Sequence, residues 1–212
     1  MDNQSPVPPA AFFKLNNWIA RPVEMNDVPT IYCWVNDPEL RPYLNRSFPV
    51  HISEEEDWIK DLPKRKEHHQ VWMIVVDGIP IGTMGLHNIN WQNRTATTGA
   101  MFGNKAYQNC GIGQQVKMML LKHAFDRLNL RQIYSEVIGF NARSRAYSEK
   151  CGYHLIATLP DDIHYEGRFF DKLILRVRRE DWLPLWERFR EVHNIESLEE
   201  MLLRHRSKPV ES

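Results

Sequence analysis

The longest amphipathic pattern in the chain begins near Gly113. Val116, Leu120, Ala124 and Leu128 follow at four-residue steps, and many positions between them are polar. Residues at this spacing lie on one face of a helix, because the α-helix has about 3.6 residues per turn. The pattern therefore predicts a long helix with one apolar face.

Two short apolar runs precede this helix. The first covers residues 71–76 and stops at Asp77-Gly78, and a second extended run follows from Ile79 to Leu86. Asp-Gly is a preferred dipeptide of two-residue hairpin turns. The two runs therefore predict a β-hairpin. Further strands are predicted at residues 95–102, 133–138, 153–158 and 172–177.

Polar residues mark the starts of two helices before the hairpin. Asp27 is the predicted N-cap of the first, which is expected to end near Asn36. The second is expected to begin at a capping box, with Ser53 as the N-cap and Glu56 three residues later. The predicted order is strand, two helices, three strands, helix, strand, helix and two strands, which is a mixed α/β layout.

The predicted elements divide the chain into three parts. We expect residues 1–14 to form a flexible tail, residues 15–180 to form one domain, and residues 181–212 to form a helical extension. Within the extension, Trp182, Leu185, Trp186 and Phe189 have helical spacing. They either pack on the domain or form an oligomer contact, and both interpretations stay open.

Composition excludes several classes of protein. The 212 residues include 27 Lys+Arg and 27 Asp+Glu, and this zero net charge gives no support for a nucleic-acid or membrane-surface binder. The three cysteines are scattered without a CxxC pair, so neither a disulfide scaffold nor a metal site is expected. No run approaches the roughly 18 apolar residues of a membrane span. A cytoplasmic location is the resulting prediction.

One glycine-containing segment has the form of an anion site. Residues 108–113, Gln-Asn-Cys-Gly-Ile-Gly, lie directly before the long helix. Free backbone N–H groups and the helix dipole favour a phosphate there, and glycine permits close approach. Taken alone, a plain glycine turn explains the segment equally well. Walker A and Rossmann patterns are absent, since the third Rossmann glycine would fall at Val116.

Several linked motifs resemble those of the GNAT superfamily of N-acetyltransferases. They are Tyr-Gln-Asn-Cys-Gly-Ile-Gly at 107–113, Asn-Ala-Arg-Ser-Arg-Ala-Tyr-Ser-Glu-Lys-Cys-Gly-Tyr at 141–153, Gly-Arg-Phe-Phe-Asp at 167–171, and Arg-Glu-Asp-Trp at 179–182. The last two are similar to the branch that holds ribosomal-protein and spermidine N-acetyltransferases. The resemblance covers roughly residues 17–182. It implies the GNAT acyl-CoA N-acyltransferase fold, a mixed but mostly antiparallel sheet flanked by helices, with extra C-terminal helices here.

The resemblance also implies which residues bind acetyl-CoA. Backbone amides of the loop would hold the pyrophosphate, the end of the fourth family strand would pair with the pantetheine arm, and an asparagine after the next strand would contact it. The corresponding residues are Phe102, Gly103, Gln108, Asn109, Cys110, Gly111, Ile112, Gly113, Gln114 and Asn141. Arg143 or Lys117 would approach a CoA phosphate, with a solvated helix charge as the alternative for each.

The catalytic residues are less well marked. Many family members have a tyrosine four residues before the glycine of the Gly-aromatic pair, where this chain has Ser148, and Tyr147 comes one position earlier. We rank Ser148 ahead of Tyr147 as the group that serves the leaving thiolate. Glu136 is the leading candidate for the base. His87, Asp171, Glu166 or a water molecule are alternatives.

These features predict an enzyme that moves acetyl from acetyl-CoA to a primary amine by direct attack in a ternary complex, without a metal. The acceptor is a protein N-terminus, an amino sugar or another small amine. A polyamine is disfavoured, because the glutamate of the spermidine-type pattern is replaced by Thr98. The rival interpretations are a non-catalytic acyl-CoA sensor on the same fold and an interaction protein. Neither nucleic acid nor membrane is an expected partner, and a homodimer stays among the alternatives.

Overall fold

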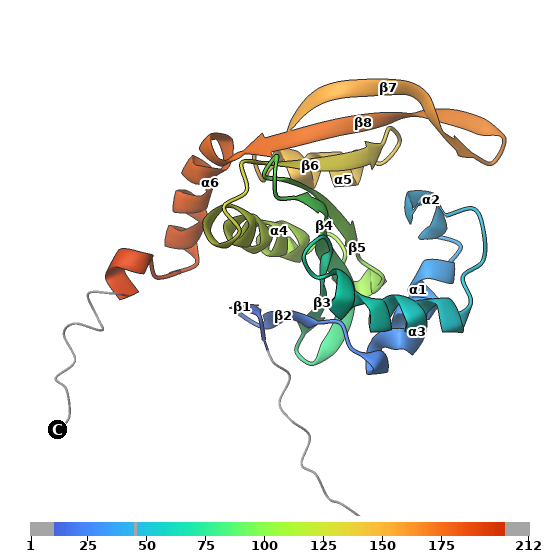
Figure 1. Ribbon diagram of the computed structural model, residues 1–212, viewed down its shortest axis with the longest axis horizontal. Coiled ribbons are helices and arrows are strands. Elements are labelled where there is room, and N and C mark those ends of the chain that lie inside the picture. Colours follow the sequence, from blue (N-terminus) through green and yellow to red (C-terminus); the bar gives the residue numbers. More distant parts are fainter. Residues whose placement is uncertain (1–10, 45, 202–212) are drawn as a thin grey trace, which may run out of the picture.

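One eight-stranded sheet organises the residues described by the computed structural model, 11–44 and 46–201 (Figure 1). Its strand order is β1-β2-β3-β4-β5-β6-β8-β7. The strands are β1 (Phe13–Leu15), β2 (Trp18–Pro22), β3 (Gln70–Val76), β4 (Ile79–Asn90), β5 (Thr95–Met101), β6 (Gln132–Ile138), β7 (His154–Tyr165) and β8 (Arg168–Arg178). All neighbouring strands are antiparallel except β5 and β6, which confirms the predicted mixed, mostly antiparallel sheet.

Helices cover both faces of this sheet (Figure 1). They are α1 (Val28–Asn36), α2 (Arg41–Leu44), α3 (Ile52–Asp61), α4 (Ile112–Lys122), α5 (Ala142–Glu149) and α6 (Arg179–Val192), with short helical turns η1 (Met25–Asp27), η2 (Leu62–Arg65) and η3 (Lys105–Tyr107), and a π-helical continuation of α4, η4 (His123–Arg127). Strand β3 is apolar from Val71 to Val76 because each face meets a helix layer. Trp72 and Ile74 join the core that contains α4, whereas Met73 and Val75 join the core under α1 and α3.

The local signals at the turns and helix starts were mostly informative. The hairpin is confirmed, since Val76 pairs with Ile79 across Asp77 and Gly78, whose φ angles of 49° and 82° fit the turn type that favours Asp-Gly. Helix α1 follows Asp27 and ends at Asn36, as predicted.

The predicted capping box of the second helix is wrong by two residues. Helix α3 has His51 as its N-cap, and the Glu54 carboxylate accepts a hydrogen bond from the His51 amide at 2.7 Å. Three consecutive glutamates follow Ser53, so three registers, with the N-cap at residue 51, 52 or 53, offer a glutamate at the required third position. The sequence pattern alone could not choose between them.

Strands β5 and β6 separate part-way along their length. Their parallel pairing covers only residues 95–97 with 132–134, although β5 continues to Met101 and β6 to Ile138. One residue beyond the last pair on β5, the Thr98 hydroxyl donates to the Tyr134 carbonyl at 3.2 Å. The C-terminal halves of the two strands are therefore not paired with each other. The chain continues from these ends towards the N-termini of α4 and α5.

Helix α6 follows β8 directly and packs through its aromatic residues. Trp182 is fully buried, with its ring 5.2 Å from that of Phe125 and 5.4 Å from that of Trp186. These side chains belong to the same core as α4. Met201 lies at the limit of the described part of the chain, and Leu202, which shares its predicted apolar stripe, lies outside it. Among the described residues, no helix combines the length and apolarity that crossing a membrane requires.

Two imidazoles lie in surroundings that disfavour their charged form. His87 packs against the backbone of β4 and β5, where a Cβ at Gly99 would lie 2.9 Å from its Nε2 atom. Burial, followed by the charge of His69, lowers the pKa of His87 to about 4. His123 packs against Trp72, and burial, followed by the charge of Arg127, lowers its pKa to about 4. Both rings are therefore neutral in the folded protein at neutral pH.

We expect the free energy of unfolding to decrease as the pH falls from about 6.5 towards 4. The unfolded chain binds protons at these histidines near pH 6.5, whereas the folded chain resists protonation until about pH 4. Above pH 6.5 neither state binds the protons and this contribution to the pH dependence vanishes. His87→Gln should remove on the order of 1–3 kcal/mol of the acid-induced loss. Urea unfolding at pH 7.0 and 5.0 measures it, and an unchanged difference between the two pH values would contradict the assignment.

Candidate functional site

The loop before α4 leaves its backbone N–H groups free. The amides from Asn109 to Gly113 donate no hydrogen bond to any acceptor in the described residues. Asn109 and Gly111 have φ angles of 62° and 81°, and Gly111 is the N-cap of α4. Left-handed residues alternating with ordinary ones turn successive N–H groups towards one point, and the helix dipole adds positive potential there. The loop therefore has the form of an anion-binding concavity.

The glycines of this loop keep the concavity open. A Cβ on Gly111 would have no protein atom within 4 Å, so the space beside it is empty and available to a ligand. A Cβ on Gly113 would lie 3.2 Å from the Phe102 ring. A diphosphate can therefore approach the backbone closely. The free amides and the open glycine would fit a diphosphate such as that of acetyl-CoA, and its binding by these residues stays a prediction.

Gln108 and Arg143 connect this loop to its surroundings. The Gln108 side-chain amide donates to the Phe102 carbonyl at 3.4 Å, and Arg143 donates to Gln108 Oε1 at 2.6 Å. These bonds tie the end of β5, the loop and the first turn of α5 together. Arg143 is exposed beside the loop, so its predicted approach to a CoA phosphate stays a prediction. Cys110 donates to the Tyr107 carbonyl instead of facing the core.

The segment after β5 and the N-terminus of α5 form the other two sides of the region. Gly103 lies against α1, because a Cβ there would come within 2.1 Å of the Trp34 ring. Asn141 is the N-cap of α5, and its side-chain oxygen accepts from the Ser144 amide at 3.0 Å. Its Nδ2 group has no acceptor among the described residues and is the part left to contact a ligand.

Helix α4 and helix α5 share a buried polar pair. The Lys117 ammonium donates to the Ser148 hydroxyl oxygen at 2.8 Å, and the two side chains are 1% and 0% exposed. The ammonium also lies 4.2 Å from the centre of the Tyr147 ring and 4.7 Å from that of Tyr153. The interpretation of Lys117 as a solvated helix charge is therefore wrong, and its approach to a CoA phosphate stays a prediction. Its chain points inward because Lys117 follows Val116 on the apolar side of the helix.

No carboxylate of the described residues balances the charge of this pair. In the described part of the chain no carboxylate lies within 4 Å of the Lys117 ammonium, which has one hydroxyl and two ring faces as partners. The Ser148 hydroxyl accepts from Lys117 and donates to no described residue. An unbalanced buried cation is costly. A ligand that becomes negative beside Ser148 would offset that cost.

Two neighbouring groups are excluded as acid–base residues. Burial raises the pKa of the Cys151 thiol to about 11, so this cysteine is protonated at neutral pH and is a poor nucleophile. Burial raises the pKa of Tyr153 well above its usual value. The hydroxyl groups of Tyr153 and Thr98 are 3.0 Å apart. This contact gives Thr98 a structural role at the strand junction, the point after Thr97 and Tyr134 where β5 and β6 stop pairing.

The residues predicted as candidates for the general base lie in different parts of the sheet. Glu136 is exposed on β6, two residues beyond the last pair with β5, on the face opposite the core residues Ile133 and Val137. His87 lies on β4, and its lowered pKa makes it a weak base. Asp171 accepts from the Asp161 amide at 3.3 Å, and its carbonyl accepts from the Gly139 amide at 2.7 Å, so it lies beside the C-terminal end of β6.

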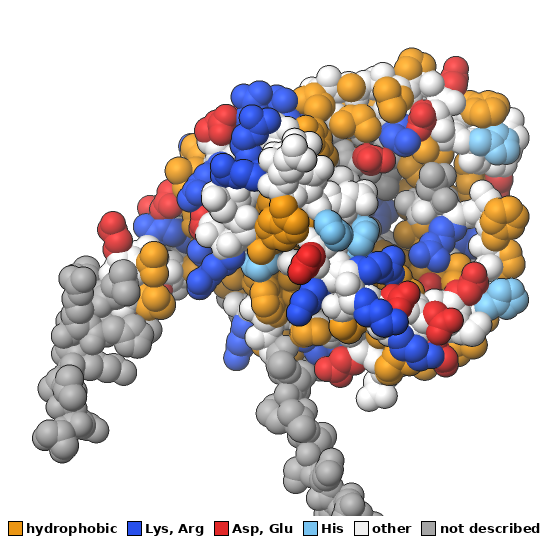
Figure 2. Space-filling view, viewed as in Figure 1, with side chains coloured by type: hydrophobic (Ala, Val, Ile, Leu, Met, Phe, Trp, Pro, Cys, Tyr) orange, Lys and Arg blue, Asp and Glu red, His pale blue; other side chains and the backbone are white. Residues whose placement is uncertain are grey.

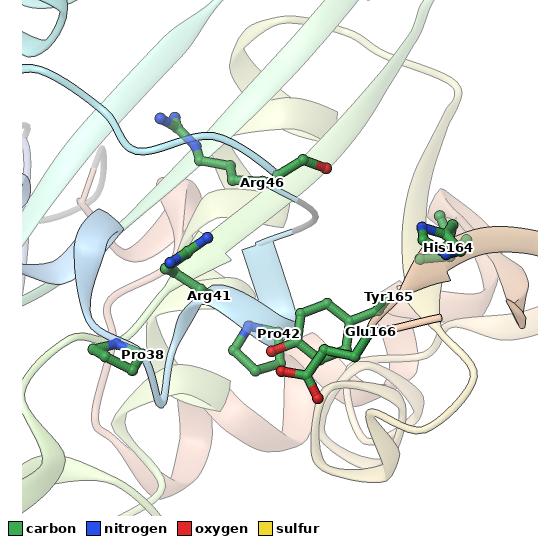
Figure 3. Close-up of a pocket in the computed structure, with 9 residues that line it drawn as sticks. Pro38, Arg41, Pro42, Arg46, His164, Tyr165 and Glu166 are labelled. Atoms are coloured by element: carbon green, nitrogen blue, oxygen red, sulfur yellow. The ribbon is translucent and has the colours of Figure 1, made fainter. Parts of the chain in front are cut away.

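A pocket with a volume of about 380 Å³ lies between α2 and the β7–β8 hairpin. Arg41 and Arg46 line it from the α2 side, and His164, Tyr165 and Glu166 line it from the hairpin (Figure 3). Figure 2 shows this face hollowed beside the position of α2, with acidic and basic side chains intermingled elsewhere on the face. Glu166 therefore lines this pocket and is not at the strand junction. In the described residues no group of histidines, cysteines and carboxylates has the arrangement of a metal site.

Comparison with known protein families decides the assignment. The family described as Acetyltransferase (GNAT) domain matches residues 18–154, which is more than half of the chain. The chain belongs to the GNAT acetyltransferase family. The resemblance drawn from the sequence motifs is thereby confirmed, and with it the prediction of an acetyl-CoA-dependent N-acetyltransferase.

Relatives of this GNAT protein have diverged far in sequence. YdaF of Bacillus subtilis (strain 168), provisionally named a ribosomal N-acetyltransferase, is 26% identical over 109 residues, which are 51% of this chain and 59% of that protein. The chain therefore spans little more than half of that relative. Uncharacterized N-acetyltransferase p20 of Bacillus licheniformis is 24% identical over 167 residues, 76% of this chain and 93% of that protein.

A solved structure supports the fold. The spermidine N-acetyltransferase from Vibrio cholerae, in complex with CoA and spermine, is 20% identical, with a TM-score of 0.73 that covers 79% of this chain and 98% of that one. At this identity the likeness shows the fold alone.

Sequence reasoning missed part of the site of this GNAT protein. Lys117 has the pattern of a helix lysine, and its burial depends on α5 folding over α4. Arg41 and Arg46 come together with the β7–β8 hairpin only through long-range packing, more than 110 residues apart in the chain. A signal existed for Lys117, because it follows Val116 and precedes Leu120 and Leu121 on the buried side of an amphipathic helix.

Proposed function

We propose that this GNAT protein transfers acetyl from acetyl-CoA to a primary amine by direct attack within a ternary complex. The observation that carries the proposal is the set of free amides from Asn109 to Gly113 beside an open glycine, next to the separated strands β5 and β6. Acetyl-CoA supplies an acetyl carbon activated by its bond to sulfur. The chain supplies a place for the diphosphate, a junction where β5 and β6 part, and polar groups on both sides of it.

Ser148 is the proposed donor to the leaving thiolate. Its oxygen is occupied by the Lys117 ammonium, so the hydroxyl hydrogen is free to point elsewhere. Negative charge develops on sulfur as the carbon–sulfur bond breaks, and a preorganised donor stabilises it. The buried Lys117 ammonium adds positive charge directly behind that donor. Tyr147, whose ring covers the ammonium, is the second candidate and keeps water from it.

Glu136 is the proposed base on the opposite face of the sheet. An amine with a pKa near 10.4 must lose a proton before or during attack. Glu136 lies just past the strand junction and is accessible to an acceptor or to an intervening water. We therefore assign it the removal of that proton, directly or through water.

Glu136→Gln should lower kcat by about a hundredfold, in the usual range for a lost general base. Affinity for CoA should not change, because Glu136 lies away from the loop. Thiol release measured from pH 6 to pH 9 should show the largest loss at low pH, because the neutral amine on which the variant depends becomes about tenfold scarcer with each pH unit below the pKa. An equal loss at every pH, or no loss, would count against this role.

The proposed function as a whole is tested by thiol release from acetyl-CoA in the presence of a panel of primary amines. We expect turnover with at least one amine and a mass increase of one acetyl group on it. Tight CoA binding without turnover on any amine would favour the non-catalytic sensor. A chain that does not bind CoA would contradict the cofactor site itself.

A further inference from the structure

The pocket between α2 and the β7–β8 hairpin adjoins the proposed acetyl-transfer site. Ile163 lines the pocket and pairs with Phe170 across the hairpin. The Phe170 ring lies 4.8 Å from that of Phe140, and Tyr43 of α2 lies 5.8 Å from the same Phe140 ring. Phe140 immediately precedes Asn141, the N-cap of α5. Ring contacts therefore connect the pocket to the end of β6.

Two guanidinium groups give this pocket its chemical character. Arg41 has no carboxylate within 4 Å in the described residues, and Arg46 approaches the buried carboxylate of Glu55 only at 3.5 Å. Other carboxylates nearby are already paired. Asp37 and Glu39 bind Lys105, and Asp162 binds Lys172.

One acidic side chain lines the same pocket. Glu166 belongs to the hairpin turn and interacts with the Tyr165 hydroxyl. Figure 3 shows the guanidinium ends of Arg41 and Arg46 directed away from the Glu166 carboxylate. The α2 side of the pocket therefore offers two planar donors for an anion, whereas the hairpin side carries the negative charge.

We propose that the acceptor amine carries an anionic group, a carboxylate or a phosphate, which Arg41 and Arg46 bind in this pocket. The inference rests on the proposed acetyl transfer and names the substrate class of that site. Guanidinium groups bind both anions through paired N–H donors. A polycation would meet two guanidinium groups there, of which Arg41 has no carboxylate partner among the described residues, so it is a disfavoured acceptor for a reason independent of Thr98.

Matched amines that differ only in the anionic group test the proposal. One arm compares β-alanine, 4-aminobutyrate and 6-aminohexanoate with alkylamines of the same length. The preferred chain length also measures the distance between the anion bound in the pocket and the amine that is acetylated. A second arm compares O-phosphoethanolamine with ethanolamine. We expect kcat/KM to be about tenfold or more higher for the anionic member of at least one pair. The arm that shows the preference identifies carboxylate or phosphate.

Arginine variants assign that preference to the pocket. Arg41→Gln should abolish it by raising KM for the anionic amine, with kcat for the neutral amine and CoA affinity unchanged. Arg46→Gln is combined with Glu55→Gln, so that no unpaired buried carboxylate remains. Arg188→Gln, an exposed position on α6 away from the pocket in Figure 1, is the matched control and should keep the preference.

The outcomes separate this inference from the proposed function. Equal use of neutral and anionic amines, or a preference for spermidine, would overturn the inference and leave acetyl transfer intact. A preference that survives in both pocket variants would also overturn it. No thiol release with any amine, while CoA still binds, would overturn the proposed function and this inference with it.

Discussion

Alanine at Gly111 should weaken CoA binding at least about tenfold, which corresponds to about 1.4 kcal/mol. Gly111 has a φ of 81°, and a Cβ there would enter the empty space beside the free amides. The methyl group would occupy the place of the diphosphate. If the alanine at position 111 left the left-handed conformation to relieve its strain, the backbone amides of the loop would no longer point towards one site. Calorimetric titration with CoA measures the loss.

Gly78 provides a closely matched control. Its φ is 82°, and a Cβ there would likewise have no protein atom within 4 Å, but it lies in the β3–β4 turn. Gly78→Ala and Gly111→Ala should therefore each cost about 1–2 kcal/mol of stability for the left-handed alanine. Only Gly111→Ala should lose CoA affinity. Equal affinities for the two variants would show that the loop is a plain glycine turn.

Lys117→Met should lower turnover by about 10- to 100-fold while leaving CoA affinity and KM for the amine unchanged. Methionine fills a similar volume and removes a buried charge that no carboxylate in the described part of the chain balances. Removing an unbalanced buried charge offsets the lost hydrogen bond, so we expect the free energy of unfolding to change by no more than about 1 kcal/mol. Steady-state kinetics and urea unfolding measure the two effects separately.

Ser148→Ala completes this test. It leaves the buried ammonium without its hydroxyl partner, so the variant should lose about 1–3 kcal/mol of stability as well as turnover. Combining it with Lys117→Met should restore much of the stability but none of the turnover. A purely structural pair would instead show turnover that follows stability in all three variants. Larger loss from Tyr147→Phe would reverse the ranking of Ser148 over Tyr147.

Much of the fold could be predicted because its signals are local. The Asp77-Gly78 turn, the N-cap at Asp27 and the four-residue steps after Gly113 each depend on a few neighbouring residues. The long hairpin of β7 and β8 was only partly predicted. Its turn at Glu166-Gly167, with φ angles of 47° and 76°, lies outside the predicted strands, and β7 is largely exposed, so hydrophobic alternation is weak along it.

The candidate site could be predicted only where backbone groups form it. The anion-binding concavity before α4 depends on glycine conformation and on the start of a helix, and both are visible in the sequence of residues 108–113. The Lys117–Ser148 pair and the arginine pocket depend on contacts across 31 residues and more. Side-chain type alone cannot show that a helix lysine is buried or that Arg41 meets a distant hairpin.

The most direct test of the account is a crystal structure of this GNAT protein with CoA bound. We predict that the diphosphate accepts hydrogen bonds from the amides of Asn109 to Gly113, that the pantetheine arm runs between β5 and β6, and that the thiol lies within hydrogen-bond distance of Ser148. CoA bound elsewhere on the chain, or a thiol remote from Ser148 and Tyr147, would contradict the account.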